Sequence, residues 1–103
     1  MDKVEKLIFF LKESPNDSFL QHVLALEYIK EGKNFEARSL LESILKREPS
    51  YIGSYYQLAK LLERNGEITE ALEWYEKGLA AAQIAADHKA FNELRAAYEE
   101  LKA

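Results

Sequence analysis

The chain has 103 residues, with 14 basic and 18 acidic side chains, a formal net charge of −4 and no cysteine. This length fits one domain with one modest core, and an acidic balance without basic clusters argues against binding nucleic acid or an anionic membrane. The absence of cysteine excludes disulfides and thiolate metal sites.

The first two predicted helices are separated by a segment that contains proline. Residues 2–13 carry apolar side chains at helical spacing, namely Val4, Leu7, Ile8 and Leu11. The apolar run at residues 7–11 is too short for a membrane span or a signal-peptide core, so we expect a soluble, cytoplasmic protein without a targeting segment. Residues 14–17 end this helix and cap the next, residues 18–31, which stops at Gly32 because glycine tolerates positive φ.

Two further helices are predicted between Gly32 and a second glycine. Asn34 is a suitable cap for the third helix, which runs to about Arg47 before residues 48–50 turn the chain. The fourth helix covers residues 51–64 and ends at Asn65-Gly66, much as the second helix ends at Gly32.

The last two predicted helices differ in length from the earlier pairs. The fifth begins near Ile68 or Thr69 and continues through the alanine-rich residues 80–86, because alanine is the strongest helix former. This helix should therefore be about one turn longer than the third. Asp87 is a suitable cap for the sixth helix.

Residue types recur 34 positions apart, which marks a repeat architecture. The pairs are Pro15 and Pro49, Leu24 and Leu58, Ala25 and Ala59, Gly32 and Gly66, Glu36 and Glu70, Ala37 and Ala71, Glu42 and Glu76, and Leu45 and Leu79. The order of apolar, small and glycine residues indicates two helices that pack closely around a tight turn. A partial copy shifted by 36 positions follows, since Phe91, Leu94 and Tyr98 repeat the spacing of Tyr55, Leu58 and Leu62.

These residues resemble the tetratricopeptide repeat (TPR) family. One copy holds Leu24-Ala25, Tyr28, Gly32, Ala37, Leu41, Leu45 and Pro49, and the next holds Tyr55, Leu58-Ala59, Leu62, Gly66, Ala71, Tyr75 and Gly78-Leu79. The resemblance implies an all-α fold, a right-handed superhelix of antiparallel helix pairs in a TPR-like α-solenoid. It also implies a non-catalytic scaffold for a protein or peptide partner, without identifying that partner.

We expect a single domain made of half a repeat, two full repeats and a cap. The half-repeat helix covers residues 1–14, the two repeats cover 15–48 and 49–86, and the capping helix covers 87–103. The small residue that follows leucine in both full copies is replaced by Arg95 in the last helix. No further helix should therefore pack closely on that side.

The sequence holds no constellation that is typical of catalysis or cofactor binding. There is no phosphate-binding glycine loop, no histidine pair at metal spacing and no cysteine nucleophile. We therefore predict no enzymatic activity, no metal and no cofactor. The alternative, a small-molecule-binding or enzymatic domain, would require a buried polar cluster that the sequence does not indicate.

The family resemblance implies a concave groove lined by the first helices of successive repeats. The positions that the repeat core leaves free are Phe19, His22, Leu26, Ile29 and Lys30 on the second helix, and Tyr56, Gln57, Lys60, Glu63 and Arg64 on the fourth. The apolar members either line a groove for an amphipathic or acidic-aromatic peptide, with Lys60 and Arg64 on its rim, or are covered on both sides of their helix. Some family members hold a C-terminal carboxylate with lysine and asparagine. Here the corresponding positions hold His22, Leu26 and Gln57, which argues against that mode.

The first helix offers a second candidate surface. Each of Val4, Ile8 and Phe9 has one counterpart in each of the two later copies, and five of these six counterparts are polar or charged. Either these side chains cover a core edge left open by the missing half-repeat, or they form the contact of a homodimer.

Overall fold

The computed structural model describes all 103 residues and contains six α-helices and no strand. The helices are α1 (Lys3–Glu13), α2 (Ser18–Lys30), α3 (Asn34–Arg47), α4 (Gly53–Arg64), α5 (Ile68–Ile84) and α6 (His88–Lys102). The predicted number and order of helices are confirmed. None of the six combines the length and apolar character that crossing a membrane would require.

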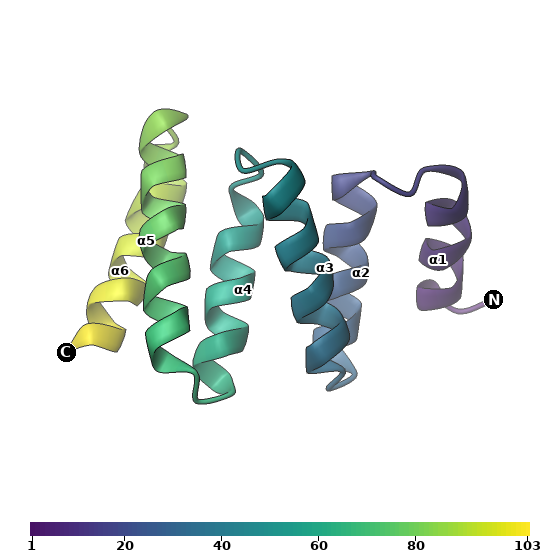
Figure 1. Cartoon of the computed structure of the whole chain (residues 1–103), viewed down its shortest axis with the longest axis horizontal. Helices are drawn as coiled ribbons and strands as arrows, with labels where there is room; N and C mark the ends of the chain where they lie inside the picture. The colour runs from purple at the N-terminus through teal and green to yellow at the C-terminus, as the bar shows by residue number, and fades with distance from the viewer.

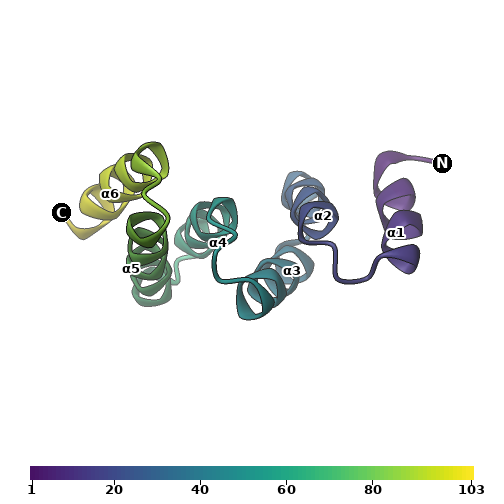
Figure 2. The same cartoon turned by 90° about the horizontal axis from the view of Figure 1, so that it is seen from above.

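The helices stack side by side in chain order, so that the two termini lie at opposite ends of an elongated molecule (Figure 1). The principal extents are 43 × 29 × 19 Å. Seen from above, α2, α4 and α6 form one row while α3 and α5 form a second row alongside it, lower in the view (Figure 2). Each helix therefore packs mainly on its neighbours in sequence, as expected for a solenoid.

Small side chains occupy fully buried positions at the repeat spacing. Ala25, Ala37, Ala59 and Ala71 are all fully buried, which confirms the role that their repeat spacing predicted. Gly78 of α5 serves the same purpose, because a Cβ atom added there would lie 2.7 Å from the Cβ of Tyr55. The continuous core runs from α2 to α6, whereas Leu7 is the only buried residue of α1.

Three helix termini share one hydrogen-bond pattern. After α2, the N–H groups of Gly32 and Lys33 donate to the carbonyls of Ile29 and Tyr28, and equivalent bonds follow α4 and α5. The central residue has positive φ each time, +75° at Gly32 and +79° at Gly66, as predicted. After α5 this position is Ala86, with φ +55°.

The prediction that α5 continues through residue 86 is wrong at its end, because this turn stops the helix at Ile84. With 17 residues against 14 in α3, α5 is still about one turn longer, as predicted. The extra turn lengthens one wall of a surface groove that is described below.

The helix starts confirm two caps and correct one. The side chains of Asp17 and Asp87 accept hydrogen bonds from the N–H groups of Leu20 and Ala90, at 3.0 Å in both cases. Asn34 does not cap α3; it is the first helical residue, and its side chain donates to that of Asn65 at 3.3 Å. The fourth helix begins at Gly53 rather than at residue 51.

Arg38 ties α3 to the start of α5. Its guanidinium donates to the carboxylates of Glu42 on its own helix and of Glu67 and Glu70 in the next repeat, with 2.6 Å between Nη1 and the Glu67 oxygen. A planar, permanently charged fork can bind several carboxylates at once. This contact holds α3 and α5 in register.

Candidate functional site

Two adjoining clefts lie between α4 and α6, in the row of helices that the family resemblance places on the concave side. One has a volume of about 290 Å³ and includes His22, Gly53, Asp87 and Leu94; the other, of about 480 Å³, includes Lys60, Ala97 and Glu100. Tyr56, Gln57 and Glu93 line both clefts. We refer to the two together as the α4–α6 groove.

The groove brings together four of the ten predicted groove residues. His22, Tyr56 and Gln57 line the smaller cleft, and Tyr56, Gln57 and Lys60 line the larger one. The six that line neither cleft are Phe19, Leu26, Ile29, Lys30, Glu63 and Arg64.

The predicted apolar stripe on α2 is divided between packing and exposure. Ile29 is half-buried and packs against the core, which agrees with the alternative that α2 is covered on both sides. Leu26 is also half-buried, whereas Phe19 leaves 64% of its surface exposed. Lys30 is ion-paired with Glu27 on its own helix, 3.1 Å between Nζ and a carboxylate oxygen. Arg64 is exposed.

Glu63 is held by residues of the protein itself. Its carboxylate accepts a hydrogen bond from the Tyr75 hydroxyl on α5 at 2.9 Å, and Lys60 Nζ lies 3.7 Å away. Burial of the fully enclosed Tyr75, together with the adjacent carboxylate, raises the pKa of this hydroxyl, which therefore stays protonated as a donor. Glu63 thus orients Lys60, whose ammonium also lies 5.8 Å from the centroid of the Tyr56 ring.

His22 bridges α2 and α4 at the end of the groove. Its Nδ1 lies 2.8 Å from the hydroxyl oxygen of the fully buried Ser54, and its ring centroid lies 5.7 Å from that of Tyr51. Desolvation lowers the pKa of His22, so the imidazole is neutral at pH 7. The groove therefore contains no histidine charge near neutral pH.

The acidic wall on α6 was not predicted. Glu93 and Glu100 face the α4 side chains across the groove, and Asp87 lies at one end. A signal was present in the sequence, because the shift of 36 that aligns Tyr55 with Phe91 also aligns Gln57 with Glu93 and Arg64 with Glu100. Where α4 has the cationic Arg64, α6 thus has the anionic Glu100.

On α1, Ile8 and Phe9 are exposed by 40% and 51%, and the neighbouring Phe10 by 52%. Val4 is half-buried. If these side chains cover an open edge of the core, they do so incompletely, because about half of Phe9 remains exposed to water.

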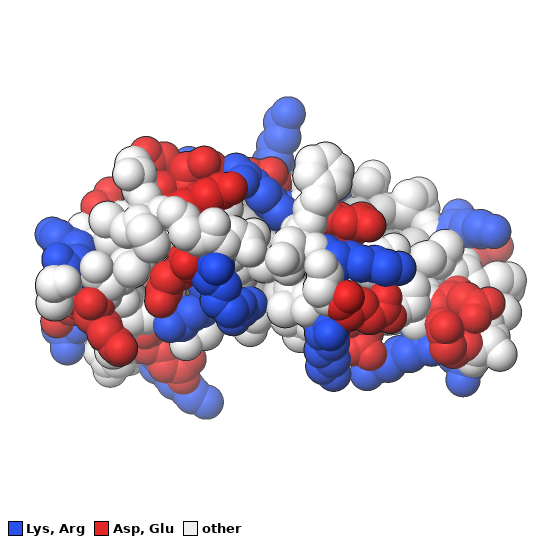
Figure 3. All heavy atoms as spheres, turned by 90° about the horizontal axis from the view of Figure 1, so that it is seen from below, with Lys and Arg blue, Asp and Glu red and all other residues white.

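The charged side chains alternate in sign over the face seen in Figure 3, where no broad area carries one sign alone. No cluster of three or more histidine, aspartate or glutamate side chains comes together closely enough to hold a metal ion. The lining of the α4–α6 groove is likewise mixed, with apolar, cationic and anionic side chains.

A family model described as tetratricopeptide repeat matches residues 28–98. The chain belongs to the tetratricopeptide repeat family. The expected all-α TPR solenoid is therefore confirmed. Proteins of this family generally use the fold to bind other proteins. A comparison with curated proteins gave no match.

Solved structures of other TPR proteins superpose closely on this one. A TPR domain protein from Salinibacter ruber is 32% identical over 84% of this chain and 88% of its own, with a TM-score of 0.81. A protein from Bordetella parapertussis is 26% identical over 99% and 89% of the two chains, with a TM-score of 0.85. The TPR2B domain of yeast Sti1, solved as a complex with pHsp70, is 17% identical over 96% and 79%, with a TM-score of 0.88.

Proposed function

We propose that this TPR protein is a non-catalytic interaction module that holds a peptide or helix of a partner protein in the α4–α6 groove. The observation that carries this proposal is the pairing of an apolar strip with two rims of opposite charge. Tyr56 and Ala97 provide the strip, Lys60 forms one rim, and Glu93 and Glu100 form the other. Apolar anchors provide affinity in such grooves, while charges set register and orientation.

A structural neighbour supports the use of this fold for binding a partner. The TPR2B domain of yeast Sti1, which shares the helix arrangement, forms a complex with pHsp70. At 17% identity the likeness concerns the fold alone, so the partner of the present protein must be inferred from its own groove chemistry.

The acidic wall favours one of the two peptide types that the sequence suggested. An acidic-aromatic peptide would meet repulsion from Glu93 and Glu100, which lie across from the single groove cation Lys60. We therefore propose an amphipathic segment that turns its basic side chains toward α6 and an acidic side chain toward Lys60. The neutral His22 at the end of the groove leaves this balance unchanged near pH 7.

Photo-crosslinking from inside the groove tests the proposal. A photo-reactive residue in place of Gln57, which lines both clefts, should trap the partner in cell extract. With the purified partner, Tyr56→Ala should weaken binding roughly thirtyfold, as expected for an aromatic anchor. Lys60→Glu should change mainly the association rate and its dependence on salt.

Lys6→Glu is the matched control, because Lys6 is exposed on α1 and makes no ion pair. It reverses the same charge outside the groove and should leave the affinity unchanged. Circular dichroism should show equal helicity for all variants. A trapped partner that binds the Tyr56→Ala and Lys60→Glu variants as tightly as the wild type would place the functional surface elsewhere.

A homodimer through α1 is the second candidate function. The observation that favours it is the exposure of Ile8, Phe9 and Phe10 on one short helix that contributes little to the core. Burying such a patch against its symmetry mate would remove apolar surface from water.

Sedimentation distinguishes this candidate. Combined Ile8→Glu and Phe9→Glu substitutions should convert a dimer to a monomer without loss of helicity, because neither residue is buried in the single chain. A wild-type protein that is already monomeric at high concentration would exclude the dimer.

A further inference from the structure

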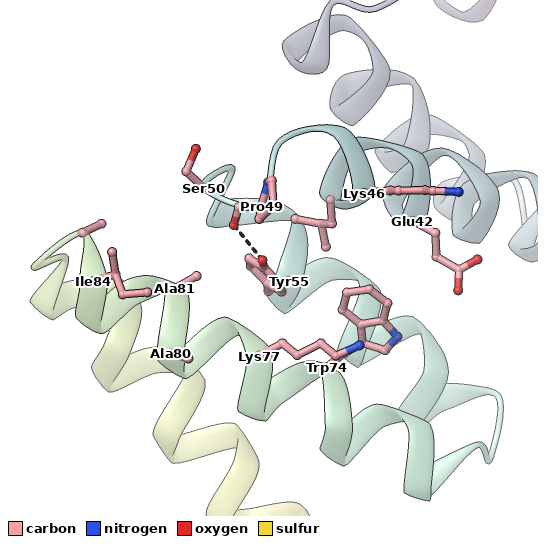
Figure 4. Close-up of a pocket in the computed structure, with 12 residues that line it drawn as sticks. Glu42, Lys46, Pro49, Ser50, Tyr55, Trp74, Lys77, Ala80, Ala81 and Ile84 are labelled. Carbon is pink, nitrogen blue, oxygen red and sulfur yellow. Dashed lines mark hydrogen bonds between the residues drawn. The ribbon is translucent and has the colours of Figure 1, made fainter.

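A second groove, formed by one continuous cleft, lies on the opposite row of helices, between α3 and α5. It has a volume of about 770 Å³ (Figure 4). Its floor contains Leu45 and Tyr55, each only 5% exposed, and its α5 wall carries Trp74, Ala81 and Ile84. We refer to it as the α3–α5 groove. None of its lining residues was predicted to be functional.

The groove depends on the mismatch in length between α3 and α5. By the 34-residue period the last residue of α3, Arg47, corresponds to Ala81, so residues 82–84 of α5 have no counterpart in α3. This additional turn presents Ile84 at the rim with 88% of its surface exposed. A large apolar side chain left in water beside an apolar floor is a common feature of interaction surfaces.

The charges around the groove are positive. Lys46 on α3 and Lys77 on α5 both line it, and neither has an ion-pair partner. Glu42 is the one carboxylate in the lining against these two lysines, and it accepts a hydrogen bond from Arg38 Nε at 3.3 Å. The groove is therefore locally cationic in a chain with a net charge of −4.

The polar groups of the groove favour a peptide over a small ligand. The Tyr55 hydroxyl already donates to the Pro49 carbonyl at 2.6 Å, as Figure 4 shows, and so is not free to orient a ligand. The Lys77 ammonium lies 4.3 Å from the centroid of the Trp74 ring, which keeps a cation directly above the apolar wall. Small-molecule sites rely on several converging polar groups, whereas peptide grooves combine apolar anchors with charged rims.

We propose that the α3–α5 groove is a second docking surface, whose occupant is an acidic peptide segment of another protein with one or more large apolar anchors. The anchors pack on Leu45, Trp74 and Ile84, and the carboxylates of the segment pair with Lys46 and Lys77. This occupant has the opposite charge requirement from the one that we propose for the acidic α6 wall. The protein then joins two partners on opposite sides of the solenoid.

A displayed library of random short peptides, selected on the immobilised protein, tests the charge requirement. Wild-type protein should enrich peptides with acidic residues around large apolar ones, and the Lys46→Glu, Lys77→Glu double variant should not. Synthetic copies of the enriched peptides should lose about tenfold or more in affinity for that double variant, because like charges then face each other. The Lys6→Glu, Lys12→Glu double variant makes the same charge change on α1 and should bind like the wild type.

Trp74 reports which groove is occupied, because it is the only tryptophan of the chain and lines this groove alone. Enriched peptides synthesised without tryptophan should shift its emission to shorter wavelength on titration. Lys60→Glu, in the α4–α6 groove, should change neither the shift nor the affinity, so this test is independent of the function proposed above.

Three results would overturn the proposal. One is a selection whose enriched peptides bind the wild type and the Lys46→Glu, Lys77→Glu variant equally; another is binding that leaves the Trp74 emission unchanged. The third is a blue shift that grows with protein concentration without peptide, which would assign the groove to a second copy of this chain.

Discussion

Replacement of Ala59 by tryptophan should unfold the domain. Ala59 on α4 and Ala71 on α5 are both fully buried in the same core cluster, where the helices approach too closely for a large side chain. Overpacking of a core by even small additions costs about 1 to 3 kcal/mol, and an indole ring greatly exceeds such additions. Because a domain of this size has only about 5 to 15 kcal/mol of stability, we expect a loss of folded helix at room temperature or a much lower melting temperature.

The repeat provides matched variants for this test. Ala25→Trp introduces the same change one repeat earlier and should act in the same direction, since Ala25 is also fully buried. Arg95→Trp introduces it at the corresponding position of α6, where the side chain is exposed, and should be tolerated. Circular dichroism and thermal melting measure all three. Unchanged melting of the two alanine variants would show that the proposed repeat register is wrong.

Replacement of Ala86 by glycine should instead stabilise the protein. Ala86 has φ +55° in a turn whose two counterparts place Gly32 and Gly66 at φ +75° and +79°. The left-handed conformation costs an L-residue roughly 1 to 2 kcal/mol, which exceeds the entropy that glycine adds to the unfolded chain. A net gain of about 1 kcal/mol would raise the melting temperature by about 4 to 8 °C.

Ala85→Gly is the control for this prediction. Ala85 precedes Ala86 and has φ −80°, within the ordinary helical region, so glycine there only increases the freedom of the unfolded chain. Its melting temperature should fall slightly. An equal decrease in melting temperature in the two variants would contradict the left-handed conformation at Ala86 and the view that α5 ends as α2 and α4 do.

Local interactions account for what the sequence predicted correctly. Gly32 and Gly66 end helices because glycine itself tolerates positive φ. Asp17 and Asp87 cap helices through hydrogen bonds to residues three positions away. Two predictions at helix ends were wrong, one for a tertiary reason and one for a local reason. Asn34 bonds to Asn65 in a distant turn instead of capping its own helix, and Ala86 ends a helix that alanine propensity alone would extend.

The repeat period by itself determined the family and the stacking of helix pairs, because small residues at a fixed spacing specify how closely neighbouring helices pack. Only the tertiary structure decided which surface residues act together. The Tyr75 hydroxyl on α5 donates a hydrogen bond to the Glu63 carboxylate. The packing of α6 places Glu93 and Glu100 opposite Lys60. The longer α5 forms one wall of a groove over Leu45. These arrangements depend on contacts between helices and on helix lengths, which the pattern along one helix does not specify.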